Sequence, residues 1–180
     1  MPSAVDPADR LELQLLAAAL LLEDGFQHEK VVRKAADLVA EGFDGDATVE
    51  LAGQPVHLRG VRRSDLEPLF RSMLSEVNVS WPSMEEAGWL KARSIAELML
   101  SGTIPPVRGA SQLWGLWGAC GEPGDELTEM LQLRDAWESS VGPQRADAER
   151  EILAYAPAII AAADQHLGRV EKGGPVPNAG

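Results

Sequence analysis

The side chains that most often hold metal ions are scattered along this sequence. Its three histidines stand at His28, His57 and His166, in separate segments. None belongs to a His-Glu-x-x-His or Glu-x-x-His pattern, in which ligands share one face of a helix. Cys120 is the only cysteine, so a multi-thiolate metal site and an internal disulfide are both excluded. We therefore expect no metal site and no cofactor.

Two residues could act as nucleophiles, and both are expected in unfavourable surroundings. Cys120 falls near the C-terminus of a predicted helix, where the helix dipole opposes formation of a thiolate. Ser111 falls inside the same helix and lacks the Gly-x-Ser-x-Gly turn of hydrolases. No glycine-rich phosphate loop is found, and nothing would raise the pKa of one carboxyl group in a catalytic pair. We expect no catalytic residues.

Acidic side chains are concentrated in one short segment. Six of them fall within 17 residues, and Arg134 is the one basic residue among them. They could form a docking surface for a basic protein partner, or only the exposed face of a helix whose first-turn acids complement its dipole. On the first interpretation the partner-binding residues are Glu122, Asp125, Glu126, Glu129, Asp135 and Glu138.

All five tryptophans occur after residue 80, from Trp81 onward. Some of them could line a small-molecule pocket between helices, which is where helical bundles hold ligands. The residues of this candidate pocket are Trp114, Trp117, Trp137 and Arg134. Large aromatic side chains more commonly fill core volume, and we expect that role here.

The helix that would position these groups is expected at residues 106–119. A Pro-Pro pair suits its first turn, because the first helical position needs no backbone N–H. Within it, Ser111, Gly115 and Gly118 recur at helical spacing and form a stripe with almost no side chain. We expect a neighbouring element to pack closely on this small-residue stripe, with indole rings beside it.

Apolar residues recur at helical spacing through most of the remaining chain. Asp6 before Pro7, and Ser64 three residues before Glu67, are typical helix N-terminal caps. The apolar pattern crosses Pro157 without losing register, which favours one kinked helix at that point. Further helices are expected at residues 7–23, 26–41, 64–77, 83–100, 125–138 and 143–167.

Residues 47–58 fit two descriptions. Residues 47–52 form a short helix that ends at Gly53, or the segments on either side of Gly53 form a two-stranded hairpin. We favour the helix, because an isolated hairpin is only marginally stable. The expected fold class is all-α: a single compact bundle of seven or eight helices, with the short hairpin as the alternative at 47–58.

The bundle is expected to have two halves that share one core. Turn residues between Asn78 and Pro82 separate an N-terminal helical half, 1–79, from a Trp-rich helical half, 80–168. Residues 169–180 contain glycine, proline and few apolar groups, so we expect them to form a disordered tail.

Charge and hydropathy narrow the class of partner. Acidic residues outnumber basic residues 28 to 16, for a net charge of −12. Nucleic-acid binding needs clustered lysine and arginine, so we expect no nucleic-acid partner.

The longest apolar runs, Leu15–Leu22 and Leu153–Ala163, fall short of the roughly 18–20 residues that a membrane span needs. No positively charged leader precedes the first run, and we expect a soluble cytoplasmic protein with no membrane partner.

The run Gly121–Glu138 begins Gly-Glu-Pro-Gly-Asp-Glu-Leu and ends Arg-Asp-Ala-Trp-Glu. It resembles a segment of small helical proteins of high-GC bacteria. The run Thr48–Gly53, followed by the apolar positions of Leu66–Val77, is similar to the first half of the same proteins. The resemblance would cover most of the chain, but it implies no activity, so no functional residue follows from it.

These features lead to one expected function and one alternative. We expect a non-catalytic protein that binds a basic protein partner through its acidic helical face. One version is an inhibitor or immunity-type protein that masks this partner. The alternative is a small-molecule-binding protein, or a metal-independent enzyme, with a Trp-lined pocket between helices. The sequence does not determine the oligomeric state.

Overall fold

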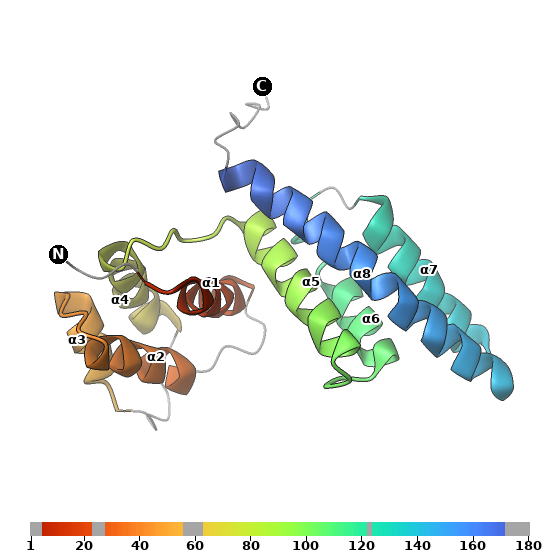
Figure 1. Ribbon diagram of the computed structural model, residues 1–180, viewed down its shortest axis with the longest axis horizontal. Helices are drawn as coiled ribbons and strands as arrows, with labels where there is room; N and C mark the ends of the chain where they lie inside the picture. The colour runs from red at the N-terminus through yellow and green to blue at the C-terminus, as the bar shows by residue number, and fades with distance from the viewer. Residues whose placement is uncertain (1–4, 23–27, 56–62, 122–123, 172–180) are drawn as a thin grey trace. The chain divides into compact units, whose positions relative to one another are not determined.

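A computed structural model of the chain describes residues 5–22, 28–55, 63–121 and 124–171. In these residues every regular element is an α-helix, so the all-α expectation is confirmed (Figure 1). None of the helices in the described ranges combines the length and apolarity that a membrane crossing needs. The helices are α1 Pro7–Leu21, α2 His28–Ala40, α3 Asp46–Ala52, α4 Arg63–Glu76, α5 Met84–Leu100, α6 Pro106–Gly115, α7 Asp125–Ser139 and α8 Pro143–Glu171.

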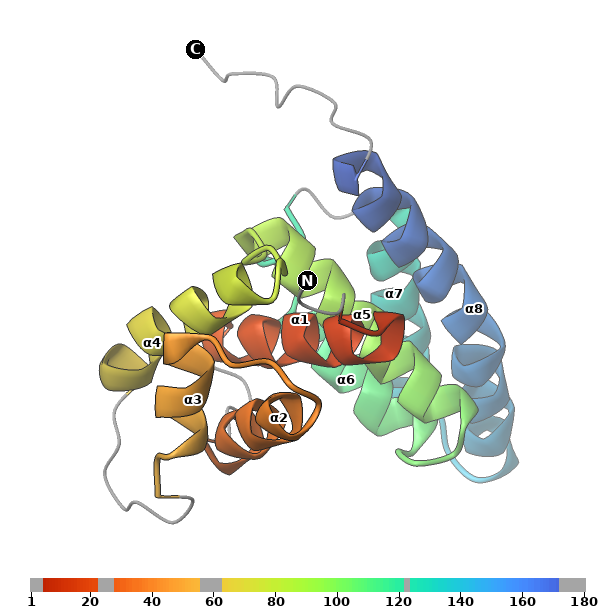
Figure 2. The same ribbon diagram turned by 60° about the vertical axis from the view of Figure 1, so that its left-hand side comes forward.

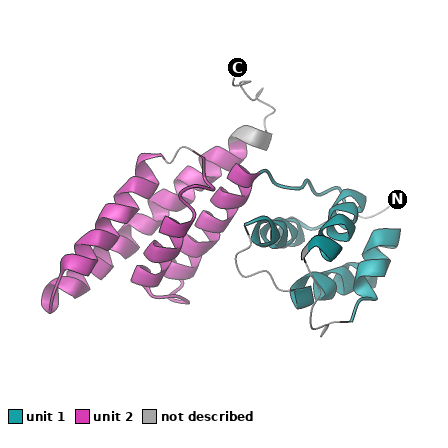
Figure 3. Ribbon diagram, turned by 180° about the vertical axis from the view of Figure 1, so that it is seen from behind, with its two compact units in different colours: residues 1–83 teal, residues 84–180 magenta. Residues whose placement is uncertain are grey.

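The chain divides into two compact units (Figure 3). Unit 1 comprises residues 1–83 and holds α1 to α4, and unit 2 comprises residues 84–180 and holds α5 to α8. Asn78, between α4 and α5, has a φ of +55°. Asparagine tolerates this left-handed conformation better than most residues, which suits the turn that ends α4.

Unit 1 is organised around α3 and α4. The short helix α3 packs against α2 and against α4 (Figure 2). The expected helix at 47–52 is therefore confirmed, and no strand forms in residues 46–55; residues 56–58 of the alternative hairpin lie outside the described residues. Of the six apolar positions predicted for α4, Leu69 is half-buried and packs against the core that α4 shares with α1, α2 and α3. The other five are buried: Leu66, Phe70, Met73, Leu74 and Val77.

The N-terminus of α3 is capped from another helix. Its own N-cap residue, Gly45, has no side chain to accept a hydrogen bond. Glu76, the last residue of α4, accepts hydrogen bonds from the amide nitrogens of Ala47 and Thr48 at 2.8 and 2.9 Å, and from Thr48 Oγ1 at 2.7 Å. A Cβ atom at Gly45 would collide with this carboxylate. Glycine at this position therefore makes room for the cap.

One buried charge joins α1 to α2. The side chain of Lys34 is only 6% exposed, and its Nζ lies 2.5 Å from Asp9 Oδ1 and 2.7 Å from Glu12 Oε2. Burial lowers the pKa of Lys34, but the hydrogen bonds and the negative charges of both carboxylates outweigh that effect and raise it. Two partners compensate the desolvation that a lone buried ammonium could not tolerate.

Unit 2 is built on the long helix α8, which packs against α5, α6 and α7. The buried positions of α8 keep helical spacing along its length, and Pro157 lies on the exposed side. The expectation that one helix passes through Pro157 is thus confirmed. The helix does not end at Gly168, and residues 169–171, expected in the tail, are helical; residues 172–180 lie outside the described residues. The buried stripe of α8 is Ala148, Ile152, Ala156, Ile159, Ala162 and Ala163.

The expected packing on the small-residue stripe is wrong. Ser111, Gly115 and Gly118 are all exposed, and no atom lies within 4 Å of a Cβ built on either glycine. The helix also ends at Gly115, so Gly118 falls in the turn that follows. The covered side of α6 is the apolar one, and its buried residues are Gly109, Ala110 and Leu113.

The close approaches in unit 2 occur at other glycines. A Cβ at Gly88 of α5 would lie 2.8 Å from the carbonyl carbon of Ala119, so the backbone after α6 passes directly over α5 there. A Cβ at Gly109 would collide with the side chain of Met99. Both glycines lie on buried faces, where the missing side chain allows close contact.

Candidate functional site

The acidic residues predicted to form one docking face do not share one side of α7. Successive residues of a helix are rotated by about 100°. Asp125, Glu126 and Glu129 therefore lie on one flank, and Asp135 and Glu138 lie roughly 160° away on the other. Glu122, the sixth predicted residue, lies outside the described residues.

The first flank lies within electrostatic reach of Tyr155 on α8. Burial raises the pKa of Tyr155 of α8, and the negative charges of Glu126, Glu129 and Asp125 raise it further. These three carboxylates are therefore within electrostatic reach of the Tyr155 hydroxyl, and all lie in the first turns of α7, where they complement the helix dipole. No basic side chain is seen to pair with Asp125, Glu126 or Glu129 in the described parts of the chain.

The second flank is organised by Arg134. Its Nη2 and Nε donate to Asp135 Oδ1 at 2.7 and 3.2 Å, and its Nε lies 3.6 Å from Glu138 Oε1. The Arg134 side chain is 16% exposed, whereas both carboxylates are more than half exposed. One largely covered cation thus holds two acidic groups at the surface.

The same guanidinium connects α7 to Trp114 in the last turn of α6 and, through that ring, to Trp117 in the turn that follows. Its Cζ lies 5.5 Å from the ring centroid of Trp114. The ring of Trp114 meets that of Trp117 edge to face, with centroids 5.4 Å apart and planes at 63°. Trp117 is half-buried, but Trp114 is 45% exposed. The other tryptophans, Trp81, Trp89 and Trp137, are half-buried or buried.

We call this group the α6–α7 patch; it consists of Trp114, Trp117, Arg134, Asp135 and Glu138. It brings together three of the four predicted pocket residues and two of the predicted partner-binding acids. The expectation that the indoles fill the core does not hold at Trp114, because a core residue would be covered.

Trp137, the fourth predicted pocket residue, contacts α8 instead. Its Nε1 donates to Glu149 Oε1 at 3.2 Å, and the guanidinium of Arg145 lies 4.5 Å from its ring centroid. Both contacts come from the first turns of α8. Trp137 therefore ties α7 to α8.

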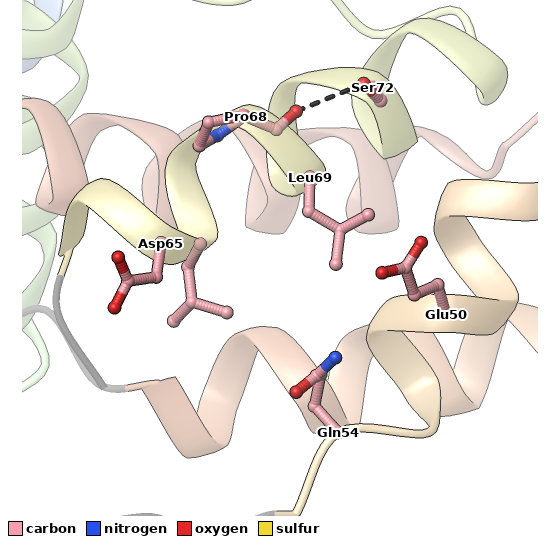
Figure 4. A pocket seen from close by; sticks show the side chains of 7 residues that line it. Glu50, Gln54, Asp65, Pro68, Leu69 and Ser72 are labelled. Atoms are coloured by element: carbon pink, nitrogen blue, oxygen red, sulfur yellow. Dashed lines mark hydrogen bonds between the residues drawn. The ribbon is translucent and has the colours of Figure 1, made fainter. Parts of the chain in front are cut away.

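A pocket of about 540 Å³ opens between α3 and α4 in unit 1 (Figure 4). Its wall carries two carboxylates, an amide and a hydroxyl among three apolar residues, and it includes none of the tryptophans. The lining residues are Glu50, Gln54, Asp65, Leu66, Pro68, Leu69 and Ser72. Any ligand here would be bound by groups that the sequence did not indicate as a site.

A further cluster joins α5 to α8 and was not predicted. The imidazole of His166 stacks on the indole of Trp89, with centroids 4.3 Å apart and planes at 11°. Glu85 lies one turn before Trp89, and its Oε1 is 3.6 Å from His166 Nδ1. His166 follows buried Ala163 by three residues, a spacing that places it beside the buried stripe of α8. From the sequence, this spacing indicates that His166 lies at an interface between helices, but it does not indicate which residue His166 contacts.

Cys120 is close to the same cluster. It is completely buried, and burial together with the negative charge of Glu85 raises the pKa of its thiol to about 12. A thiol with such a pKa carries almost no thiolate at neutral pH, so it is a poor nucleophile. Among the described residues, no group of three or more His, Cys, Asp or Glu side chains is arranged to hold a metal ion.

Searches against protein-family models, curated proteins and solved structures found no match to this chain. The function therefore has to be inferred from its surfaces.

Proposed function

We propose that this protein is a non-catalytic binding protein that recognises a basic protein partner through the α6–α7 patch. The observation that carries this proposal is the 45% exposure of Trp114, next to the paired acids Asp135 and Glu138. Tryptophan is enriched among the residues that dominate binding energy in protein interfaces, where a ring of polar groups excludes water around it. Arg134 lies 5.5 Å from the centroid of the Trp114 ring, and the two carboxylates that it binds add further polar groups to this surface.

The charge of the patch favours a basic partner. Two carboxylates share the single positive charge of Arg134, so the patch keeps a net negative charge. The whole chain carries a net charge of −12, which would attract a positively charged protein over longer distances. A lysine or arginine from the partner could pair with Asp135 or Glu138 while its stem covers the Trp114 ring.

The exposed small-residue stripe favours contact with a protein rather than with a small solute. Ser111 and Gly115 lie beside Trp114 on the exposed side of α6, and nothing covers the space above Gly115. The backbone of another protein could approach α6 closely there, because no side chain stands in its way. An inhibitor or immunity-type protein that masks a basic surface would need this combination of open backbone, indole and acids.

The first prediction concerns the partner-binding role of Trp114. We expect Trp114→Ala to abolish capture of the specific partner from a native lysate, because it removes the central apolar contact. The pair Asp135→Asn with Glu138→Gln should weaken capture. The matched control neutralises the other flank of α7 with Asp125→Asn and Glu129→Gln, and it should retain capture.

The readout is the set of proteins bound to the immobilised chain at low salt and at high salt. Circular dichroism melting establishes that each variant is folded. The same captured proteins with wild type and with Trp114→Ala would refute the role of the α6–α7 patch. Loss of capture only in the control variant would move the binding surface to the first flank of α7.

The alternative function, binding of a small molecule, is favoured by the pocket between α3 and α4. A ligand held there at about 100 times its Kd should add roughly 2.7 kcal/mol to the free energy of unfolding. A thermal-shift screen of metabolites would detect this. A shift that Leu69→Glu removes, and that Trp114→Ala leaves unchanged, would support the alternative.

A further inference from the structure

The contact between His166 and Trp89 joins two helices of unit 2 by ring stacking. The two rings are nearly parallel, at 11°, and their centroids are 4.3 Å apart. Trp89 is completely buried on α5, whereas the side chain of His166 on α8 is 25% exposed. The imidazole is therefore accessible to protons from solvent while one of its faces covers a buried indole.

Glu85 approaches the same imidazole from α5. Its Oε1 lies 3.6 Å from His166 Nδ1, and its side chain is 59% exposed. Glu85 and Trp89 are four residues apart on α5, so they present a carboxylate and an aromatic face on the same side of the helix. A positive charge on His166 would thus meet both a negative charge and the negative face of an indole ring.

We propose that the Glu85–Trp89–His166 contact is a pH-sensitive clamp that holds α8 against α5 more tightly when His166 is protonated. The neutral imidazole contributes stacking only. The imidazolium adds a cation–π interaction with Trp89 and an ion pair with Glu85. The clamp is tightest when the imidazole carries its proton and the Glu85 carboxylate is ionised.

A second charged contact joins the same two helices. On α5 and α8, Arg93 and Asp164 pair with each other, with Nε and Oδ1 3.3 Å apart, and Arg93 also lies 3.3 Å from Glu97. The thiol of Cys120, from the turn after α6, is un-ionised in this pH range, because its pKa is raised to about 12.

The acids at the start of α7 act on another residue of α8. This residue is Tyr155, which is 11 residues from His166 and so about 16 Å away along α8. Glu85 lies at the N-terminal end of α5. Arg108 lies in the first turn of α6, the helix that follows the C-terminal end of α5. Glu85 is therefore the carboxylate that meets the imidazole.

The experiment compares thermal unfolding of the full chain at pH 5.5 and pH 8. His166→Phe keeps an aromatic ring on Trp89 but removes the titrating nitrogen, and His28→Gln is the matched control that removes a histidine from unit 1. The measured quantity is the melting temperature of wild type minus that of His166→Phe. We expect this difference to be about 4 °C larger at pH 5.5 than at pH 8. His28→Gln should keep the wild-type difference. Equal pH dependence in wild type and His166→Phe would overturn the clamp.

Two further measurements keep the proposal testable if His166→Phe folds poorly. Glu85→Gln changes only an exposed carboxylate, and it should reduce the gain in melting temperature on acidification. Tryptophan fluorescence of wild type should also fall as His166 gains its proton, because a stacked imidazolium quenches an indole. A wild-type fluorescence that stays constant from pH 8 to pH 5.5, or a Glu85→Gln variant with the full acid gain, would contradict the proposal.

Discussion

At the scale of single residues, Glu76 supplies a cap that α3 cannot provide for itself. The N-cap position is Gly45, and three hydrogen bonds from Ala47 and Thr48 end on the Glu76 carboxylate. Burial raises the pKa of Glu76, but these hydrogen bonds outweigh burial and lower it. The ionised form is therefore favoured by folding, and the cap links the end of α4 to the start of α3.

This cap predicts that the free energy of unfolding depends on pH in the acid range. Because the folded-state pKa of Glu76 is below the ordinary value of 4.5, its contribution is complete above that value and is lost as the pH falls through the folded pKa. We expect Glu76→Gln to lower the free energy of unfolding by about 1 kcal/mol at pH 7, as the loss of a helix cap does. The difference in free energy of unfolding between wild type and Glu76→Gln should become smaller as the pH falls below 4.

Urea denaturation from pH 7 to pH 3 measures this effect. Glu50→Gln, which neutralises a carboxylate on α3 itself, is the control and should change stability little. An equal loss at pH 7 and at pH 3, or the same loss in Glu50→Gln, would show that the Glu76 carboxylate does not act as the cap.

At the scale of elements, the packing of unit 2 depends on which glycines meet a neighbour. Gly88 on α5 lies against the backbone at Ala119, whereas Gly115 at the end of α6 has open space above it. The expectation from the sequence was the reverse, since Gly115 belonged to the small-residue stripe. Small side chains permit close packing but do not require it, so the spacing alone could not assign the covered face.

The two glycines give a matched pair of predictions. Gly88→Ala should cost about 1–3 kcal/mol, because the new methyl group overlaps backbone atoms that cannot move aside easily. Gly115→Ala should leave the protein unchanged or stabilise it by about 0.5 kcal/mol, since alanine restricts the unfolded chain. Chemical denaturation followed by tryptophan fluorescence measures both. Equal losses in the two variants would mean that Gly115 is covered after all.

At the scale of the whole molecule, the surplus of acids acts over a longer range than any single contact. A net charge of −12 creates a field that physiological salt screens over about 8 Å. Asp125, Glu126 and Glu129 contribute to this field, but they lie outside the α6–α7 patch and within electrostatic reach of Tyr155 on α8. In the proposed function these three residues speed the encounter with the basic partner, and the α6–α7 patch makes the direct contact with it.

This division of roles predicts different kinetics for the two flanks. Neutralising Asp125, Glu126 and Glu129 should lower the association rate with the captured partner several-fold and weaken its salt dependence, with little effect on dissociation. Trp114→Ala should mainly accelerate dissociation, because it removes a contact made in the bound state. Surface plasmon resonance at several salt concentrations separates the two rates. A slower association with Trp114→Ala and an unchanged dissociation rate would contradict this assignment.

The sequence by itself determined where the helices form, because the causes are local, but the ends of α6 and α8 differ from the prediction. The apolar spacing of Leu66–Val77, the cap at Asp6 and the register across Pro157 all depend on neighbours within a few turns. The separation of the α7 acids onto two flanks also follows from helical rotation alone, and a helical projection of the sequence would have shown it.

Only the tertiary structure decided which surfaces face one another. It exposed Trp114 and Gly115, placed Gly88 under the backbone of Ala119, and stacked His166 on Trp89. These outcomes depend on pairs of residues far apart in the chain. Helical periodicity limits which face of a helix is covered, but the covering partner is chosen by how whole helices pack together.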